Sequence, residues 1–413
     1  MNDGKAVDLS DYVAAMKKTS FTQNWDIAVT FDHRKINDLL AERFRKDNHG
    51  LLTDLEVSIE LRDRLGETYT QWYQFILGSP FIQFESTPYA PSCSLKVGIA
   101  KGSVWADFGN GETESEEELE PNAYTISVCN ISLGAVTGNA QEWNDTNTLK
   151  TSGGNDLVVF PADDGYFSHI IINLAESSQL SVKIECACDV KVPCALEQDQ
   201  LFTALRDFFV REIKPIHYTL AVVNNARLSD GTTDFVPKSF RFTTLRASDV
   251  ESYFTLFIQT QSSNGRNNDQ SLQSLWTAEW AKAGVAPIPK DNSASIIIND
   301  SFFATSFINP TLARYNATST VEKTSEEEGG IRLKGTWPNV TRPDVPWETH
   351  VRLIALEETK RFRVHSVTYN PNVGGSPLQI TLAQSVCHFL VPEFVVDNID
   401  CVEWNRPTCD PVC

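Results

Sequence analysis

Residues 24–50 read NWDIAVTFDHRKINDLLAERFRKDNHG, and their apolar period changes once, at Asp32. Before that point Ile27, Val29 and Phe31 recur at every second position, which is the period of a half-buried strand. Asp32 suits the N-cap of a helix, where its carboxylate accepts a hydrogen bond from an early backbone N–H. The stretch therefore predicts a strand that leads directly into a helix.

The predicted helix covers residues 33–48 and is amphipathic. Its charged residues occupy one face up to Gly50, which offers a stop, and its apolar residues occupy the other face. The apolar stripe consists of Ile36, Leu39, Leu40 and Phe44. We expect this stripe to face the interior of the protein.

A second copy of the same unit follows in residues 293–316, SASIIINDSFFATSFINPTLARYN. Counted from Asp300, apolar side chains recur at the offsets found after Asp32, and Phe303 adds bulk beside them; they are Ala304, Phe307, Ile308 and Leu312. The match predicts a second helix over residues 300–316, interrupted or kinked at Pro310, and two pseudo-repeated halves. Two unrelated core helices are the alternative, because four matched positions also arise by chance.

Strand patterns dominate the rest of the chain. Residues 55–61 alternate cleanly, and no stretch between residues 50 and 190 has a helical period. Two more helices are predicted, over residues 197–215 and 271–284, and the apolar stripe of the first consists of Leu201, Leu205, Phe208, Phe209 and Ile213. Few helices among many antiparallel strands predict an α+β fold rather than an alternating βαβ sheet.

Charge and hydropathy narrow the classes of partner. The 413 residues carry a formal net charge of -19, which argues against nucleic acid as a partner. No apolar run approaches the ~20 residues that a membrane span requires, so we do not expect an integral membrane protein. The N-terminus lacks the plan of a secretory signal, which predicts a cytoplasmic protein or one released by a signal-independent route.

Cysteines and histidines show no spacing typical of a metal site. Cys186, Cys188 and Cys194 lie close in sequence but have no histidine nearby to complete a zinc site. The seven histidines are scattered, and no nucleophile elbow, P-loop or dinucleotide fingerprint is present. We therefore expect no catalytic residues, no metal, no cofactor and no enzyme activity.

Two motifs carry a resemblance to a known family. The opening NWDIAVTFDHRKINDLL resembles the start of the forty-seven-kilodalton accessory proteins encoded beside some clostridial neurotoxins, and SIIINDSFFATSFINPTL resembles a strand-turn-helix segment of the same family. This implies the tubular lipid-binding (TULIP) superfamily, an elongated fold in which long amphipathic helices are wrapped by highly curved antiparallel sheets. Pro310 and the cysteine-rich tail CVEWNRPTCDPVC depart from the family pattern.

The composition and the resemblance together predict a division of the chain. Residues 1–22 are polar, which predicts an N-terminal arm, and residues 399–413 are a cysteine-rich tail. Between them the resemblance implies an N-terminal TULIP-like half over residues 23–215 and a C-terminal TULIP-like half over residues 216–398.

The resemblance also implies a function, the non-enzymatic binding of a lipid or another apolar ligand in a groove between helix and sheet. The candidate groove residues are Ile36, Leu39, Leu40, Phe44, Phe303, Phe307, Ile308 and Leu312. The alternative is a structural scaffold with a filled, ligand-free interior, which binds protein partners in a toxin-related assembly.

Overall fold

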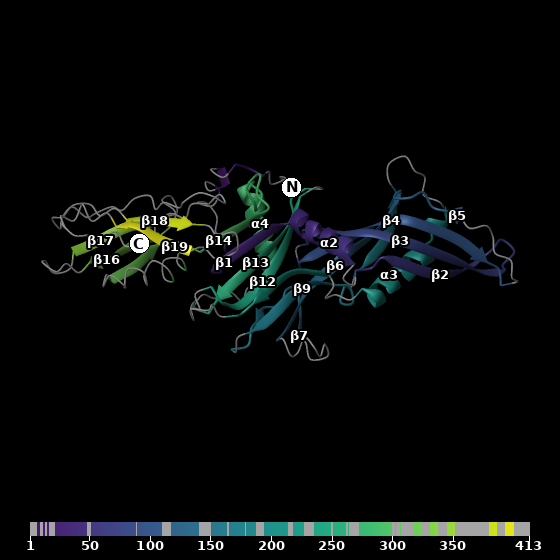
Figure 1. Ribbon diagram of the computed structural model, residues 1–413, viewed down its shortest axis with the longest axis horizontal. Helices are drawn as coiled ribbons and strands as arrows, with labels where there is room; N and C mark the ends of the chain where they lie inside the picture. The colour runs from purple at the N-terminus through teal and green to yellow at the C-terminus, as the bar shows by residue number, and fades with distance from the viewer. Residues whose placement is uncertain are drawn as a thin grey trace.

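The computed structural model of the chain describes most of residues 21–299 (Figure 1). Beyond residue 317 it describes the backbone of five strands. Apart from those five strands, the full set of described residues is 6–8, 11–12, 15, 21–47, 51–87, 89–109, 117–139, 150–162, 165–177, 179–186, 194–213, 218–226, 235–248, 251–261, 263, 272–299, 302 and 306.

The helices are short and lie close to the positions that the sequence predicts. They are α2 (His33–Asp47), α3 (Asp199–Glu212) and α4 (Leu272–Ala283), with a 3₁₀ turn η3 (Cys194–Leu196) before α3. They contain 15, 14 and 12 residues. For the described part of the chain, the prediction of long amphipathic helices is therefore wrong. The α+β class and the curved antiparallel sheets are confirmed.

The strands form two large sheets, in which every pair is antiparallel. The nine-stranded sheet has the order β11-β9-β6-β4-β3-β2, with β5 on β4 and with β7 and β10 on β6. Its strands are β2 (Asp54–Arg62), β3 (Thr68–Glu85), β4 (Ser92–Asp107), β5 (Glu117–Glu118), β6 (Tyr124–Asn139), β7 (Lys150–Gly153), β9 (Tyr166–Asn173), β10 (Ser181–Cys186) and β11 (Thr219–Asn224).

The five-stranded sheet has the order β14-β1-β13-β12-β8. Its strands are β1 (Ile27–Asp32), β8 (Val158–Val159), β12 (Pro237–Arg246), β13 (Ser252–Thr260) and β14 (Ala294–Ile298). Both sheets therefore contain strands from either side of residue 215. The predicted division at that residue stays a prediction, because much of the chain after residue 299 lies outside the described part.

The C-terminal strands form two small sheets, which Figure 1 shows at one end of the molecule. They are β15 (Thr318–Lys323), β16 (Ile331–Trp337) and β17 (Val345–Val351) in one sheet, and β18 (Ile380–Ser385) and β19 (Glu393–Ile399) in the other. Apart from Phe302 and Ser306, the second predicted helix lies outside the described residues.

Strand β1 is buried on both faces, which corrects the prediction of a half-buried strand. Ile27 and Val29 face the core on one side of the sheet, while Ala28, Thr30 and Asp32 are buried on the other. The reason is that β1 lies between β13 and β14 in a sheet with a core on each side. The residues on the second face are small or polar, so the alternation of apolar residues in the sequence does not reveal the core on that side.

Strand β2 follows its pattern closely. Leu55, Val57 and Ile59 are buried, and the residues between them are exposed, so one face of β2 packs on the core and the other meets solvent. Its neighbour β3 is longer and has register shifts against β4 between Ile76 and Pro80. The shifts keep apolar side chains facing inward on both sides of the irregularity.

Polar contacts join the two large sheets where β3 ends. The backbone N–H of Phe84 donates to Ser252 Oγ at 3.0 Å, and Thr244 Oγ1 donates to the carbonyl of Glu85 at 2.7 Å. Arg246 and Glu85 form an ion pair at 3.0 Å in the same region. These contacts fix β12 and β13 against β3, so that the apolar faces of the two sheets can share one interior.

Candidate functional site

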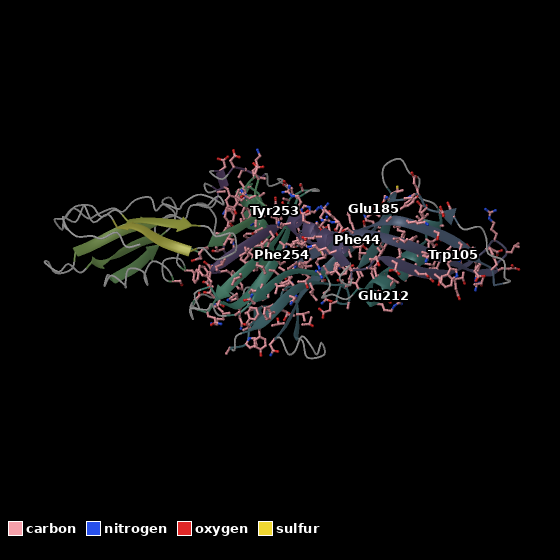
Figure 2. All side chains as sticks on the ribbon, in the orientation of Figure 1. Phe44, Trp105, Glu185, Glu212, Tyr253 and Phe254 are labelled. Atoms are coloured by element: carbon pink, nitrogen blue, oxygen red, sulfur yellow. The ribbon has the colours of Figure 1, made fainter. Side chains whose placement is uncertain are left out.

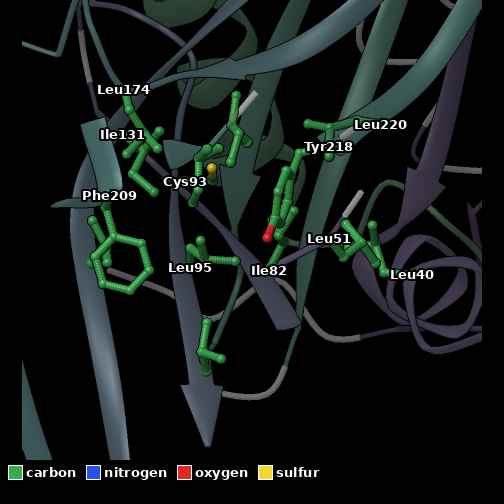
Figure 3. Packing of buried hydrophobic residues seen from close by; sticks show 14 of the residues in the cluster. Leu40, Leu51, Ile82, Cys93, Leu95, Ile131, Leu174, Phe209, Tyr218 and Leu220 are labelled. Atoms are coloured by element: carbon green, nitrogen blue, oxygen red, sulfur yellow. The ribbon is translucent and has the colours of Figure 1, made fainter. Parts of the chain in front are cut away.

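The larger of the two apolar clusters among the described residues is continuous. It runs from α3, along the inner face of the nine-stranded sheet, to α2 and then to the inner face of the five-stranded sheet. Figure 3 shows part of it, including Phe209 from α3, Leu95 from β4 and Leu40 from α2. Figure 2 places Phe254, from the five-stranded sheet, and Phe44, from α2, along the same body. This apolar interior is the candidate site.

Helix α3 lies against two edge strands of the nine-stranded sheet. It contacts both β2 and β10, which pair with β3 and β6 respectively but not with each other. Leu201, Leu205 and Phe209 are fully buried on its inner face. A hydrogen bond of 2.8 Å from Tyr73 Oη to the carbonyl of Ala195 ties the turn before α3 to β3. The sheet is thus closed at α3 by side-chain packing rather than by a backbone ladder.

Helix α2 is fixed more firmly. Its Asn37 side chain is buried and bonds both backbone groups of Ile82 in β3. The amide nitrogen donates to the carbonyl at 2.8 Å, and the backbone N–H of Ile82 donates to the amide oxygen at 2.7 Å. Strand β2 pairs only with residues 68–76 of β3, so Asn37 takes the place of a neighbouring strand at this edge.

Asp32 begins α2 as the sequence predicts. Its carboxylate accepts a hydrogen bond of 2.8 Å from the backbone N–H of Arg34, the second helical residue, and pairs with the Arg34 guanidinium. Burial raises the pKa of Asp32, but hydrogen bonds from His33 and Arg34 outweigh it and lower the pKa to about 2. The carboxylate therefore stays charged and serves as the helix cap.

Asp32, His33 and Ser252 lie together, but their geometry is that of a structural tie. His33 Nδ1 is 3.1 Å from the carboxylate of Asp32 and 3.2 Å from the backbone carbonyl of Ser252, so both contacts use the same ring nitrogen. The Ser252 hydroxyl instead accepts from the N–H of Phe84. A nucleophile relay needs the two ring nitrogens to serve different partners, and this cluster does not supply that.

The four candidate groove residues on α2 differ in position. Ile36 and Leu40 are buried in the cluster, and Phe44 is partly buried against it. Leu39 is 51% exposed and does not line the interior. The reason is that the buried arc of α2 is centred on Leu40, His33 and Asn37, which turns Leu39 toward solvent.

The other four candidate residues, Phe303, Phe307, Ile308 and Leu312, lie outside the described residues. Their neighbour Phe302 is buried in the cluster, with its ring centroid 6.3 Å from that of Phe235. The site predicted from the sequence also omits the α3 residues, although their apolar stripe is visible there. The packing partner of that stripe, the inner face of the curved sheet, cannot be recognised from the sequence.

The described residues show no group of three or more His, Cys, Asp or Glu side chains placed to hold a metal ion. The described cysteines with free thiols are Cys93, Cys129 and Cys186. Cys93 is buried, and burial raises the pKa of its thiol. In the part of the chain that is described, no helix is both long and apolar enough to cross a membrane.

No protein-family model and no curated protein matches the chain. Among solved structures, the chain is similar to the crystal structure of lipopolysaccharide binding protein. The sequence identity is 9%, the match covers 92% of this chain and 87% of that chain, and the TM-score is 0.22. A score of this size carries no argument about function, and the resemblance to the TULIP superfamily stays a prediction.

Proposed function

We propose that the protein is a non-enzymatic carrier of a lipid or another apolar ligand, which binds in the interior between α3 and the curved sheet. The observation that carries the proposal is the closure of an apolar interior by one helix held by side chains. Separating α3 from β2 and β10 breaks no strand ladder, so the main change is exposure of apolar surface. A bound acyl chain restores that burial, at ~0.8 kcal/mol for each methylene.

The position of α2 supports entry at α3. Asn37 fixes α2 to β3 through two hydrogen bonds, while the inner face of α3 contributes Leu201, Leu205 and Phe209. We infer that α2 stays in place when a ligand binds and that α3 moves away from the sheet. Ile36 and Leu40 then line the far end of the interior.

A structural scaffold is the second candidate, and the packing of the interior favours it. Phe75, Phe209 and Tyr73 fill the space between α3 and the sheet and are fully buried. A protein with this interior can serve as a rigid partner in a larger assembly, including a toxin-related one, without any ligand.

Native mass spectrometry of the purified protein, followed by organic extraction, distinguishes the two candidates. If the protein is a carrier, mass spectrometry should show a stoichiometric apolar adduct. A fluorescent fatty-acid displacement assay at micromolar protein concentration should also be positive. Leu205→Trp, which fills the interior, should abolish displacement, and Val210→Trp, on the exposed side of the same helix, should not. Circular dichroism checks that both variants fold. If the folded parent protein shows neither an adduct nor displacement, the carrier proposal is wrong and the structural scaffold is the remaining candidate.

A further inference from the structure

Two tryptophans stack on the outer face of the nine-stranded sheet. Trp72 in β3 lies directly opposite Trp105 in β4, with ring planes parallel to within 6° and ring centroids 6.2 Å apart. Their neighbours Tyr73 and Val104 are buried in the apolar interior, so the two tryptophans point the opposite way. Figure 2 shows Trp105 toward the end of the body that contains β2, β3 and β4. Both rings are partly exposed, whereas the other described tryptophan side chains are buried; these are Trp25, Trp276 and Trp280.

Carboxylates lie on each side of this pair along the strands. They occupy register positions two residues before or after the tryptophan row, where side chains point to the same face of a sheet. They are Glu56 and Glu60 from β2, Asp107 from β4 and Glu118 from β5, and all four are exposed. We call the surface formed by these four residues with Trp72 and Trp105 the tryptophan surface.

The charge of the tryptophan surface is not balanced by neighbouring cations. In the described part of the chain, none of its four carboxylates forms an ion pair. The cations on the same face, Arg62 and Lys101, lie one row further out, at opposite ends. Single exposed apolar side chains are ordinary, but two stacked indoles framed by carboxylates combine an apolar face with negative charge. Such a surface favours a cation that is flat and weakly hydrated.

We propose that the tryptophan surface binds an extended, arginine-rich segment of a partner protein. A guanidinium stacks on an aromatic face and bonds carboxylates through its edge, so one side chain can use both features of the surface. Nucleic acid and anionic membranes would be repelled by the same carboxylates.

The spacing of the rows supports an extended segment. Rows two residues apart on a strand are separated by ~7 Å, and side chains on one face of an extended peptide recur at the same interval. Arginines at every second position therefore match three rows in turn. The first row contains Glu56 and Glu118, the second contains the two tryptophans, and the third contains Glu60 and Asp107.

Fluorescence anisotropy of a labelled peptide tests the proposal. The probe alternates glycine with three arginines, and its control carries citrulline in place of each arginine, which keeps the shape of the side chain without its charge. The arginine peptide should bind saturably at low ionic strength, and the citrulline peptide should not. A peptide of the same composition with its three arginines in succession should bind more weakly, because it cannot reach all three rows.

Variants of the protein identify the surface. Trp72→Ala should weaken binding about fivefold, the loss of one cation–π contact. Glu60→Gln should weaken it about threefold, and Asp38→Asn, which removes one exposed carboxylate on α2, should leave it unchanged. Circular dichroism checks that each variant folds. Because Glu60 is exposed, its variant tests the surface even if Trp72→Ala does not fold.

Four results would overturn the proposal. They are the absence of binding by the arginine peptide, equal binding of the citrulline peptide, parental affinity in folded Trp72→Ala, and equal effects of Glu60→Gln and Asp38→Asn. Co-sedimentation of the protein with neutral phosphatidylcholine vesicles that Trp72→Ala abolishes would also overturn it, since the pair would then contact a lipid surface. The variant Leu205→Trp, which fills the interior, should bind the peptide as the parent does. Failure of this proposal is therefore distinguishable from failure of the carrier.

Discussion

The Asn37 side chain offers the sharpest test of how α2 is held. Asn37→Leu keeps the volume of the side chain but removes both bonds to Ile82, which are 2.8 and 2.7 Å long. It leaves a backbone N–H and a carbonyl without partners at a buried position. Each costs about 1–3 kcal/mol, so the expected loss of unfolding free energy is about 3 kcal/mol.

Urea unfolding followed by circular dichroism measures this loss by linear extrapolation. Hydrogen exchange at the Ile82 amide measures it locally, and about 3 kcal/mol corresponds to roughly 100-fold faster exchange. Asp38→Ala is the matched control, since Asp38 is the next residue of α2 and is exposed; its effect should stay within about 0.5 kcal/mol. A loss below about 1 kcal/mol in Asn37→Leu, with unchanged exchange at Ile82, would refute the view that Asn37 replaces a strand at this edge.

Three further predictions concern single side chains. Leu40→Asp should destabilise the protein by several kcal/mol because it buries an unpaired charge, whereas Leu39→Asp should change stability by less than about 0.5 kcal/mol; similar melting temperatures for the two variants would contradict this. The pKa of Asp32 is lowered to about 2, so its contribution to stability is present above pH ~4 and is lost as the pH falls toward 2. Asp32→Asn should therefore flatten the fall of the urea midpoint over that range, and parallel curves for variant and parent would count against the cap. Alkylation of the native protein should label Cys186, which is exposed, and spare Cys93, which is buried; rapid labelling of Cys93 would show that the core around β4 opens.

Much of the secondary structure could be predicted from the sequence because the signals are local. The predicted helix over residues 33–48 is observed as His33–Asp47, and the helices predicted over 197–215 and 271–284 are α3 and α4. Asp32 was recognisable as a cap from its residue type alone. The alternation in β2 was equally clear, since one face of that strand meets solvent.

The sequence-based predictions were wrong or incomplete for features that depend on tertiary contacts. The helical stripe alone could not show that His33 and Asn37, both polar, occupy the buried arc of α2 and leave Leu39 exposed. It also could not show which helix closes the curved sheet, because that depends on where the edges of β2 and β10 meet. The second core, on the outer face of the five-stranded sheet, was not predicted because it joins residues from Tyr12 to Ile297. Contacts of that range leave no periodic signal in the sequence.

The place of β1 in its sheet has a consequence for synthesis in the cell. Ile27 lies opposite Ile258 on one side and Ile298 on the other. Strand β1 therefore leaves the ribosome without a sheet partner and gains none until the strands containing Ile258 and Ile298 have been made. Such long-range pairing is slow, and an apolar strand that waits for its neighbours is open to aggregation. Chaperone dependence during translation should thus centre on residues 27–47, and it should end when β14 emerges and closes β1 from its second side.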